Sequence, residues 1–146
     1  MTTPTRTVKT AELAATLRGT VMRFTRRLRR ERPDNGLTLT QLSALASLYT
    51  AGAMTPRELA ESERVQPPSM TRVVAVLEER GLVLRSAHPT DGRQAILAAT
   101  DAGAALIREN RRVREAWLAR QLAALTPAER ATLRDAAAIL DRMAST

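Results

Sequence analysis

Two adjacent prolines, Pro67 and Pro68, constrain the fold of this chain more than any other feature of its sequence. Proline is excluded from a helix interior but suits the first turn, so one helix must end before this pair and another must begin at it. Gly81 stands where a helix end favours a left-handed residue. The sequence therefore predicts a helix over residues 67–80 that starts abruptly after a tight turn.

The segment before the prolines carries a helix start of its own. Thr55, Pro56 and Glu58 have the spacing of a capping box with proline at the first helical position. We expect a short helix over about 56–62. Two short helices joined by a tight turn are typical of a helix-turn-helix, although an ordinary helical hairpin gives the same pattern.

The helix over residues 67–80 has two unlike faces. Apolar residues at positions i, i+3, i+4 and i+7 predict a buried face of Met70, Val73, Val74 and Leu77. The outer face carries small or hydrogen-bonding side chains and one arginine: Pro68, Ser69, Thr71, Arg72 and Ala75. Such a face suits the major groove of DNA, where Ser and Thr reach phosphates or base edges and Arg binds guanine.

We expect the N-terminal half of this helix to be the inserted end, because Glu78 and Glu79 near its other end would repel phosphates. The predicted DNA contacts on these two helices are Pro68, Ser69, Thr71, Arg72 and, from the first of them, Arg57. Helical hairpins with a polar face are common, so the flanking sequence has to decide between DNA reading and a purely structural role.

After Gly81 the pattern changes from helical to strand-like. Residues 82–85 and 94–98 are short apolar segments, and the turn formers of 86–93 lie between them. This arrangement predicts a β-hairpin with a long tip. A hairpin that directly follows a helix-turn-helix is a wing.

The tip of this predicted wing carries Arg93, with His88 and Arg85 nearby. An arginine beside a recognition helix suits the minor groove, where the negative potential is strong, so we predict DNA contacts for Arg93 and His88. Asp91 is expected to fix the tip by hydrogen bonding. The alternative is that Asp91 and Gly92 only make the turn and that Arg93 is solvated.

The remaining helix starts are marked by threonine caps at Thr10, Thr38, Thr100 and Thr126. The helices over 10–32 and 100–144 have apolar faces with little neighbouring core to bury them. A second copy of the chain would cover these faces economically, so we expect a two-fold dimer rather than a bundle of three helices within one chain.

Arginines crowd the C-terminal half of the first helix, and we interpret them as a solvated basic face in preference to a role in attracting DNA: Arg23, Arg26, Arg27, Arg29 and Arg30.

Composition narrows the functional classes. The net charge of +8 over 146 residues indicates an anionic partner. Cysteine is absent, which excludes disulfides and thiol redox sensing, and the single histidine cannot build a zinc site. We expect no metal, no cofactor and no enzyme activity, because neither paired carboxylates nor a phosphate-cradling glycine loop is evident. With no signal peptide and no apolar run of about 18 residues, a cytoplasmic protein away from the membrane is expected.

Order and residues together resemble the MarR family of bacterial winged-helix transcription regulators. The most specific piece is the wing and its exit, in which Asp91-Gly92-Arg93 is followed by Thr100-Asp101-Ala102-Gly103. Ala99 stands where the family usually has leucine. Three further stretches are similar to family patterns, namely 39–42, 77–83 and 125–129.

This resemblance implies a mainly α fold with a small β-hairpin wing, in which a winged helix-turn-helix DNA-binding lobe joins a helical dimerisation lobe. It implies one domain over 1–146, with dimerisation helices over 10–32 and 100–144, a winged helix-turn-helix over 38–99, a recognition helix over 67–80 and a wing over 82–99. The implied function is that of a homodimeric repressor of a pseudo-palindromic operator in double-stranded DNA. Many members release DNA when a small phenolic or aromatic effector binds in a crevice between lobes, and Arg18 or Arg23 would stand at its rim. The alternative is a basic helical protein that binds RNA or DNA without sequence preference, although few aromatic residues are present for stacking.

Overall fold

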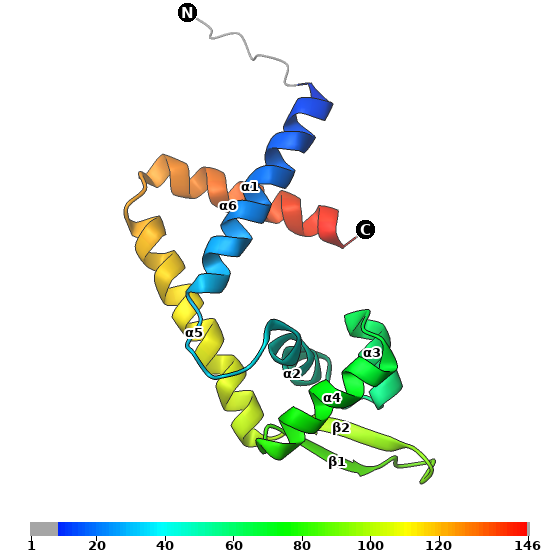
Figure 1. Cartoon of the computed structure of the whole chain (residues 1–146). Coiled ribbons are helices and arrows are strands. Elements are labelled where there is room, and N and C mark those ends of the chain that lie inside the picture. Colours follow the sequence, from blue (N-terminus) through cyan, green and yellow to red (C-terminus); the bar gives the residue numbers. More distant parts are fainter. Residues whose placement is uncertain (1–8, 146) are drawn as a thin grey trace, which may run out of the picture. The chain divides into compact units, whose positions relative to one another are not determined.

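The computed structural model of the chain describes residues 9–145, and this part contains six helices and one two-stranded sheet (Figure 1). In chain order the elements are α1 (Thr10–Arg30), α2 (Leu39–Ala51), α3 (Pro56–Glu63), α4 (Pro67–Glu79), β1 (Val83–Ala87), β2 (Ala95–Ala99), α5 (Asp101–Ala123) and α6 (Pro127–Ala144). The predicted fold class, mainly α with a β-hairpin wing, is confirmed. No helix within 9–145 combines the length and apolar character needed to cross a bilayer.

Threonine caps define most of the helix starts. Thr38, Thr55 and Thr126 each accept from the backbone N–H three residues on, and the Gln or Glu at that position accepts from the threonine N–H. These capping boxes satisfy two otherwise free donors at each helix start. The predicted cap at Thr10 is wrong: Thr10 is already helical, and Lys9 occupies the cap position without a side-chain hydrogen bond.

The chain divides into two compact units, residues 33–112 and residues 1–32 with 113–146. We call the first the winged-helix unit and the second the helical unit. The core of the winged-helix unit is built from α2, α3, α4 and the sheet, and its fully buried large side chains are Leu45, Leu59, Met70, Val74, Leu77 and Leu97. The first half of α5 also belongs here, since Ile107 lies in the same core, whereas the sequence assigned all of α5 to dimerisation.

Gly103 allows α5 to pack against the start of the hairpin. A Cβ atom at this position would lie 2.2 Å from the carbonyl oxygen of Leu82 and 3.0 Å from Leu45. Thr100 fixes the same junction, because its hydroxyl donates to the carbonyl of Gly81 at 2.6 Å and accepts from Gly103 N–H at 3.1 Å. The predicted cap at Thr100 is therefore confirmed, and it holds the exit of the wing in place.

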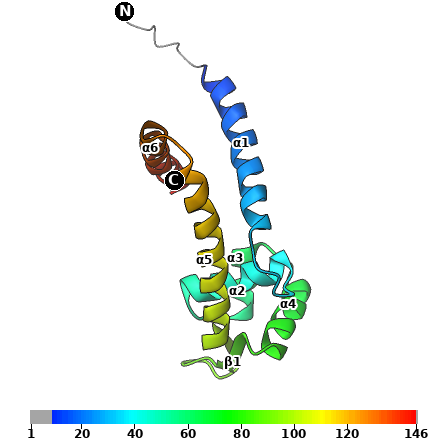
Figure 2. The ribbon, with the colours of Figure 1, turned by 90° about the vertical axis from the view of Figure 1, so that its left-hand side faces the viewer.

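The helical unit contains little buried surface of its own. Neither α1 nor α6 has a buried residue, and within this unit α6 runs across the direction of α1 rather than alongside it (Figure 2). Within this unit Phe24 meets the buried Trp117 with ring centroids 6.1 Å apart, and Arg27 stacks over Trp117 at 4.9 Å. Large apolar side chains stay exposed on α1 and α6: Leu13, Val21, Met22, Phe24, Leu133, Ile139, Leu140 and Met143.

Candidate nucleic-acid interface

The predicted break between α3 and α4 is confirmed, and a left-handed residue that the sequence did not indicate makes the turn. Arg64 ends α3 in the left-handed region with φ 53°, and the N–H of Val65 reaches back to the carbonyl of Ala60 at 3.0 Å. Pro67 then opens α4, which continues to Glu79. Gly81 has φ 70°, so the chain leaves α4 through the left-handed residue that the sequence predicted. Local backbone chemistry thus fixes both ends of α4.

The face of α4 opposite its buried stripe is exposed along its first half. Pro68, Ser69, Thr71, Arg72 and Ala75 are all exposed, whereas Met70, Val74 and Leu77 are buried. The Thr71 hydroxyl donates to the carbonyl of Pro67 at 3.0 Å, so its oxygen can still accept a hydrogen bond from outside the protein. The guanidinium of Arg72 has no partner among residues 9–145.

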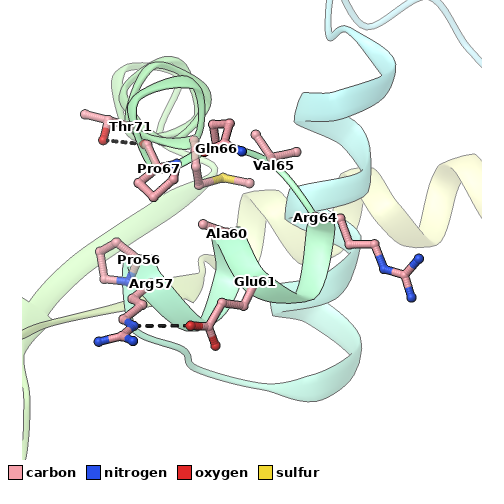
Figure 3. Close-up of a pocket in the computed structure, with 10 residues that line it drawn as sticks. Pro56, Arg57, Ala60, Glu61, Arg64, Val65, Gln66, Pro67 and Thr71 are labelled. Atoms are coloured by element: carbon pink, nitrogen blue, oxygen red, sulfur yellow. Dashed lines mark hydrogen bonds and ion pairs between the residues drawn. The ribbon is translucent and has the colours of Figure 1, made fainter.

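A hollow of about 740 Å³ lies between α3 and α4 (Figure 3). Arg57 and Thr71, both predicted DNA contacts, line it from opposite helices. Arg57 is also ion-paired with Glu61 at 3.2 Å, with both side chains largely exposed. Exposed pairs of this kind contribute little to stability, so Arg57 is free to exchange Glu61 for another anion.

The hairpin is longer than its sequence indicated. β1 pairs with β2 in antiparallel register from Val83↔Ala99 to Ala87↔Ala95, so the tip shrinks to residues 88–94. Leu97 also exchanges two backbone hydrogen bonds with Met54, at 2.7 and 3.0 Å. This bridge connects the wing to the segment just before α3. No local sequence pattern predicted it.

Asp91 builds the wing tip as predicted. Its carboxylate accepts from the N–H of Arg93 at 3.1 Å and from the side-chain amide of Gln94 at 3.3 Å. Both bonds curl the tip around Asp91. The Arg93 side chain is exposed at this tip, and its guanidinium has no partner within the described chain.

His88, which the sequence placed among the DNA contacts, serves the tip structurally with one ring nitrogen. Nδ1 accepts from the N–H groups of Thr90 and Asp91 at 3.2 and 3.1 Å. An acceptor at Nδ1 requires the tautomer that carries its proton on Nε2. Only Nε2 is therefore left as a donor toward an outside group.

Arg85 does not extend the basic surface of the tip. Its guanidinium binds Glu78 on α4, with Nη2 2.8 Å and Nε 3.3 Å from Oε1. The hydrogen bond to Glu78 raises the pKa of Arg85 further above its ordinary value, against the opposing effect of burial. The pair ties the wing to the recognition helix and neutralises one of the two carboxylates predicted to repel phosphates.

The relatives of this chain decide its family. A family model described as the MarR family matches residues 37–95. An uncharacterized HTH-type transcriptional regulator of Mycobacterium bovis is 49% identical over 130 residues, which cover 89% of this chain and 91% of the relative. The chain belongs to the MarR family. It is accordingly a DNA-binding transcription regulator.

Other members agree with this assignment. The HTH-type transcriptional repressor MdtR of Bacillus subtilis is 36% identical over 94 residues, covering 64% of this chain and 61% of the relative. A crystal structure of a Pseudomonas aeruginosa protein described as a transcriptional regulator has a TM-score of 0.83 and 35% identity, covering 93% of this chain and 95% of that one. A Staphylococcus aureus MepR mutant bound to an oligodeoxyribonucleotide shares the fold, with a TM-score of 0.68, 18% identity and coverage of 91% and 96%.

The charge of this MarR-family chain is divided unevenly between its two units. Residues 33–112 contain nine arginines and nine carboxylates, so the winged-helix unit is neutral and the whole net charge of +8 belongs to the helical unit. The winged-helix unit is thus basic only locally, through arginines such as Arg72 and Arg93, whose guanidinium groups have no partner among residues 9–145. Within 9–145 no cluster of three His, Cys, Asp or Glu side chains is arranged to hold a metal ion.

Proposed function

We propose that the protein is a homodimeric repressor that recognises a pseudo-palindromic operator in double-stranded DNA. The observation that carries this proposal is the first half of α4, where a continuous exposed face holds Ser69, Thr71 and Arg72, and Arg72 has no partner among residues 9–145. On the opposite side of the helix Met70, Val74 and Leu77 are buried, and Val73 is partly buried. A helix fixed on one side and open on the other presents its side chains to the major groove at little conformational cost. The name of the relative MdtR supports repression rather than activation.

Each side chain has a separate role in this proposal. Arg72 binds a guanine edge with two hydrogen bonds, and Thr71 offers an acceptor and a methyl group to neighbouring bases. Ser69 and Arg57 bind phosphates, and Pro68 packs against the backbone of the groove. Arg93 enters the minor groove, while His88 donates from Nε2 to a phosphate. Asp91 acts only through the shape of the tip.

The uncovered apolar faces of α1 and α6 support the proposed dimer. Leu133 and Leu140 on α6 are 47% and 39% exposed, and Phe24 on α1 is 45% exposed. Exposed apolar surface of this kind marks an interaction site, and two-fold pairing of like chains is its commonest solution. A second copy also places two recognition helices about one helical turn of DNA apart, or roughly 34 Å.

A small aromatic or phenolic effector completes the proposal, on the strength of the family relationship. An effector releases DNA only if it binds the DNA-incompetent dimer more tightly than the competent one. Titrating salicylate-like compounds into a protein–DNA complex tests this part alone. Unchanged DNA affinity at saturating compound would remove that class of effector and leave the DNA-binding role untouched.

Selection of bound sites from a random duplex library tests the function as a whole. The proposal predicts enrichment of two inverted half-sites whose centres are about 10 base pairs apart. A library that shows no enrichment would support the alternative of a basic protein without sequence preference. Enriched RNA hairpins in a parallel RNA selection would support an RNA-binding role instead.

A further inference from the structure

The winged-helix unit lacks the charge that usually draws a regulator to DNA. It is neutral as a whole, and three of its nine arginines are tied up in the ion pairs with Glu61, Glu78 and Glu109. Attraction over distances beyond a few ångströms depends on net charge, so a neutral unit draws phosphates only at close range. The positive field of this molecule comes from its helical unit.

Four arginines of the helical unit lie on one side of α1. Arg18, Arg26, Arg29 and Arg30 are exposed, and none has a partner within residues 9–145. At 100° per residue these four positions fall within an arc of about 120° around the helix axis. The only carboxylate in the second half of α1 or at its end is Glu31, and it is taken by Arg27.

Apart from Met22, which lies within the same arc, the large apolar side chains of α1 lie away from this basic face. Leu17, Val21, Phe24 and Leu28 lie on the opposite side of the helical wheel, and Phe24 packs on Trp117. The dimer contact proposed for the apolar side therefore leaves the arginines uncovered. Dimerisation also brings together two helical units that each carry a charge of +8. A bound polyanion would reduce the repulsion between them.

We propose that this face of α1, defined by Arg18, Arg26, Arg29 and Arg30, binds phosphates of duplex DNA as a second contact surface that carries no sequence preference. The inference rests on the proposed DNA-binding function and adds a surface outside the winged-helix unit. Duplex DNA is the favoured occupant because it is the polyanion that a MarR-family regulator meets, and because guanidinium groups match phosphate geometry with two hydrogen bonds. The face supplies attraction and affinity, whereas α4 supplies discrimination between sequences.

Counterion release makes the proposal measurable. Each arginine that neutralises a phosphate steepens the fall of log K against log salt by about 0.9. Replacing three arginines in each of two subunits therefore reduces the magnitude of the slope by up to about 5. Replacing an arginine that does not contact DNA changes only the screened long-range field of the protein, so it changes the slope of log K against log salt far less.

The test compares two triple variants with the same loss of charge. One carries Arg26→Gln, Arg29→Gln and Arg30→Gln on the basic face, and the control carries Arg108→Gln, Arg120→Gln and Arg134→Gln, which lie elsewhere on the surface. Glutamine keeps helix propensity nearly constant, and sedimentation checks that both variants keep the wild-type oligomeric state. The probes are a mixed-sequence duplex about 40 base pairs long, or roughly four helical turns, and the selected operator site.

The expected result is a slope reduced by about 3 to 5 in the basic-face variant and by less than 1 in the control, with the preference for operator over mixed sequence unchanged. Equal slopes in the two variants would overturn the inference. They would leave the proposed function standing as long as the wild type still prefers the operator to the mixed sequence. If the wild-type protein bound the operator no more tightly than the mixed-sequence duplex, the proposed function would be overturned, whatever slopes the variants show. Loss of binding to anionic lipid vesicles, with unchanged binding to DNA, would assign the face to a membrane surface and overturn it as well.

Discussion

Arg85 on the wing and Glu78 on the recognition helix form a two-pronged ion pair, with Arg85 Nη2 2.8 Å and Nε 3.3 Å from Oε1 of Glu78. Both partners are partly exposed, so the pair contributes under about 1 kcal/mol to the stability of the fold. For the proposed DNA-binding function the pair matters more, because it fixes the wing to α4 and neutralises a carboxylate that would otherwise repel phosphates.

Breaking this pair from its two sides should change DNA affinity in opposite directions. Arg85→Gln leaves the Glu78 carboxylate without its cation and is expected to weaken DNA binding about 3- to 10-fold. Glu78→Gln leaves the Arg85 guanidinium available for a phosphate and should strengthen DNA binding. Affinities of wild type, both single variants and the double variant on one duplex form a double-mutant cycle that measures the coupling. Additive effects with no coupling would mean that the pair does not act on DNA binding.

The acceptor role of His88 in the wing tip leads to a second prediction. His88→Ala leaves the N–H groups of Thr90 and Asp91 without their acceptor and should loosen the tip, with a loss of DNA affinity of about 5- to 20-fold, or roughly 1–2 kcal/mol. His88→Asn supplies a side-chain oxygen for an Asx-type turn and should retain most of the affinity. Amide hydrogen exchange at the tip checks the structural cause. If Asn behaves like Ala, a direct DNA contact from Nε2 outweighs the tip structure.

Gly103 is expected to tolerate no larger residue. Gly103→Ala would drive a methyl group against the carbonyl of Leu82 and should lower the free energy of unfolding by about 1–3 kcal/mol. Gly19→Ala in α1 is the matched control, since its Cβ would meet only the flexible end of Arg23 at 3.3 Å. Alanine is the better helix former, so this control should stabilise the protein by up to about 1 kcal/mol. Urea unfolding at fixed protein concentration compares them, and equal effects would contradict the close approach.

The apolar face of α6 provides a test of the dimer. Leu140→Arg places a charge in the proposed interface and should raise the dimer dissociation constant at least about 100-fold, or roughly 3 kcal/mol. Ala138→Arg adds the same charge to the opposite, exposed side of α6 and should leave the dimer intact. Sedimentation across a concentration series measures both. A wild-type protein that sediments as a single chain would rule out the proposed interface altogether.

Sequence patterns predicted the parts of this structure that are decided over a few residues. The capping boxes at Thr38, Thr55 and Thr126, the start of α4 at Pro67 and the left-handed Gly81 all follow from local backbone chemistry. Even so, Thr10 shows that a capping residue type does not by itself fix a helix boundary.

Contacts between distant segments were not predictable in the same way. The bridge from Met54 to Leu97 and the pair of Arg85 with Glu78 depend on where the folded chain brings each segment. The neutrality of the winged-helix unit was also missed, because the sequence shows total charge and the boundary at residue 112 emerges only from the fold. Position in the folded chain, rather than residue type, decided these features.

The central claim is that α4 reads base sequence, and the affinity of Arg72→Ala for the selected operator and for a mixed-sequence duplex tests it most directly. Loss of a two-bond contact to guanine should cost about 1–3 kcal/mol on the operator alone and so narrow the ratio between the two duplexes. Arg93→Ala serves as the comparison and should weaken both duplexes to a similar extent. An unchanged ratio in Arg72→Ala, with operator and mixed duplex bound as in the wild type, would contradict this account.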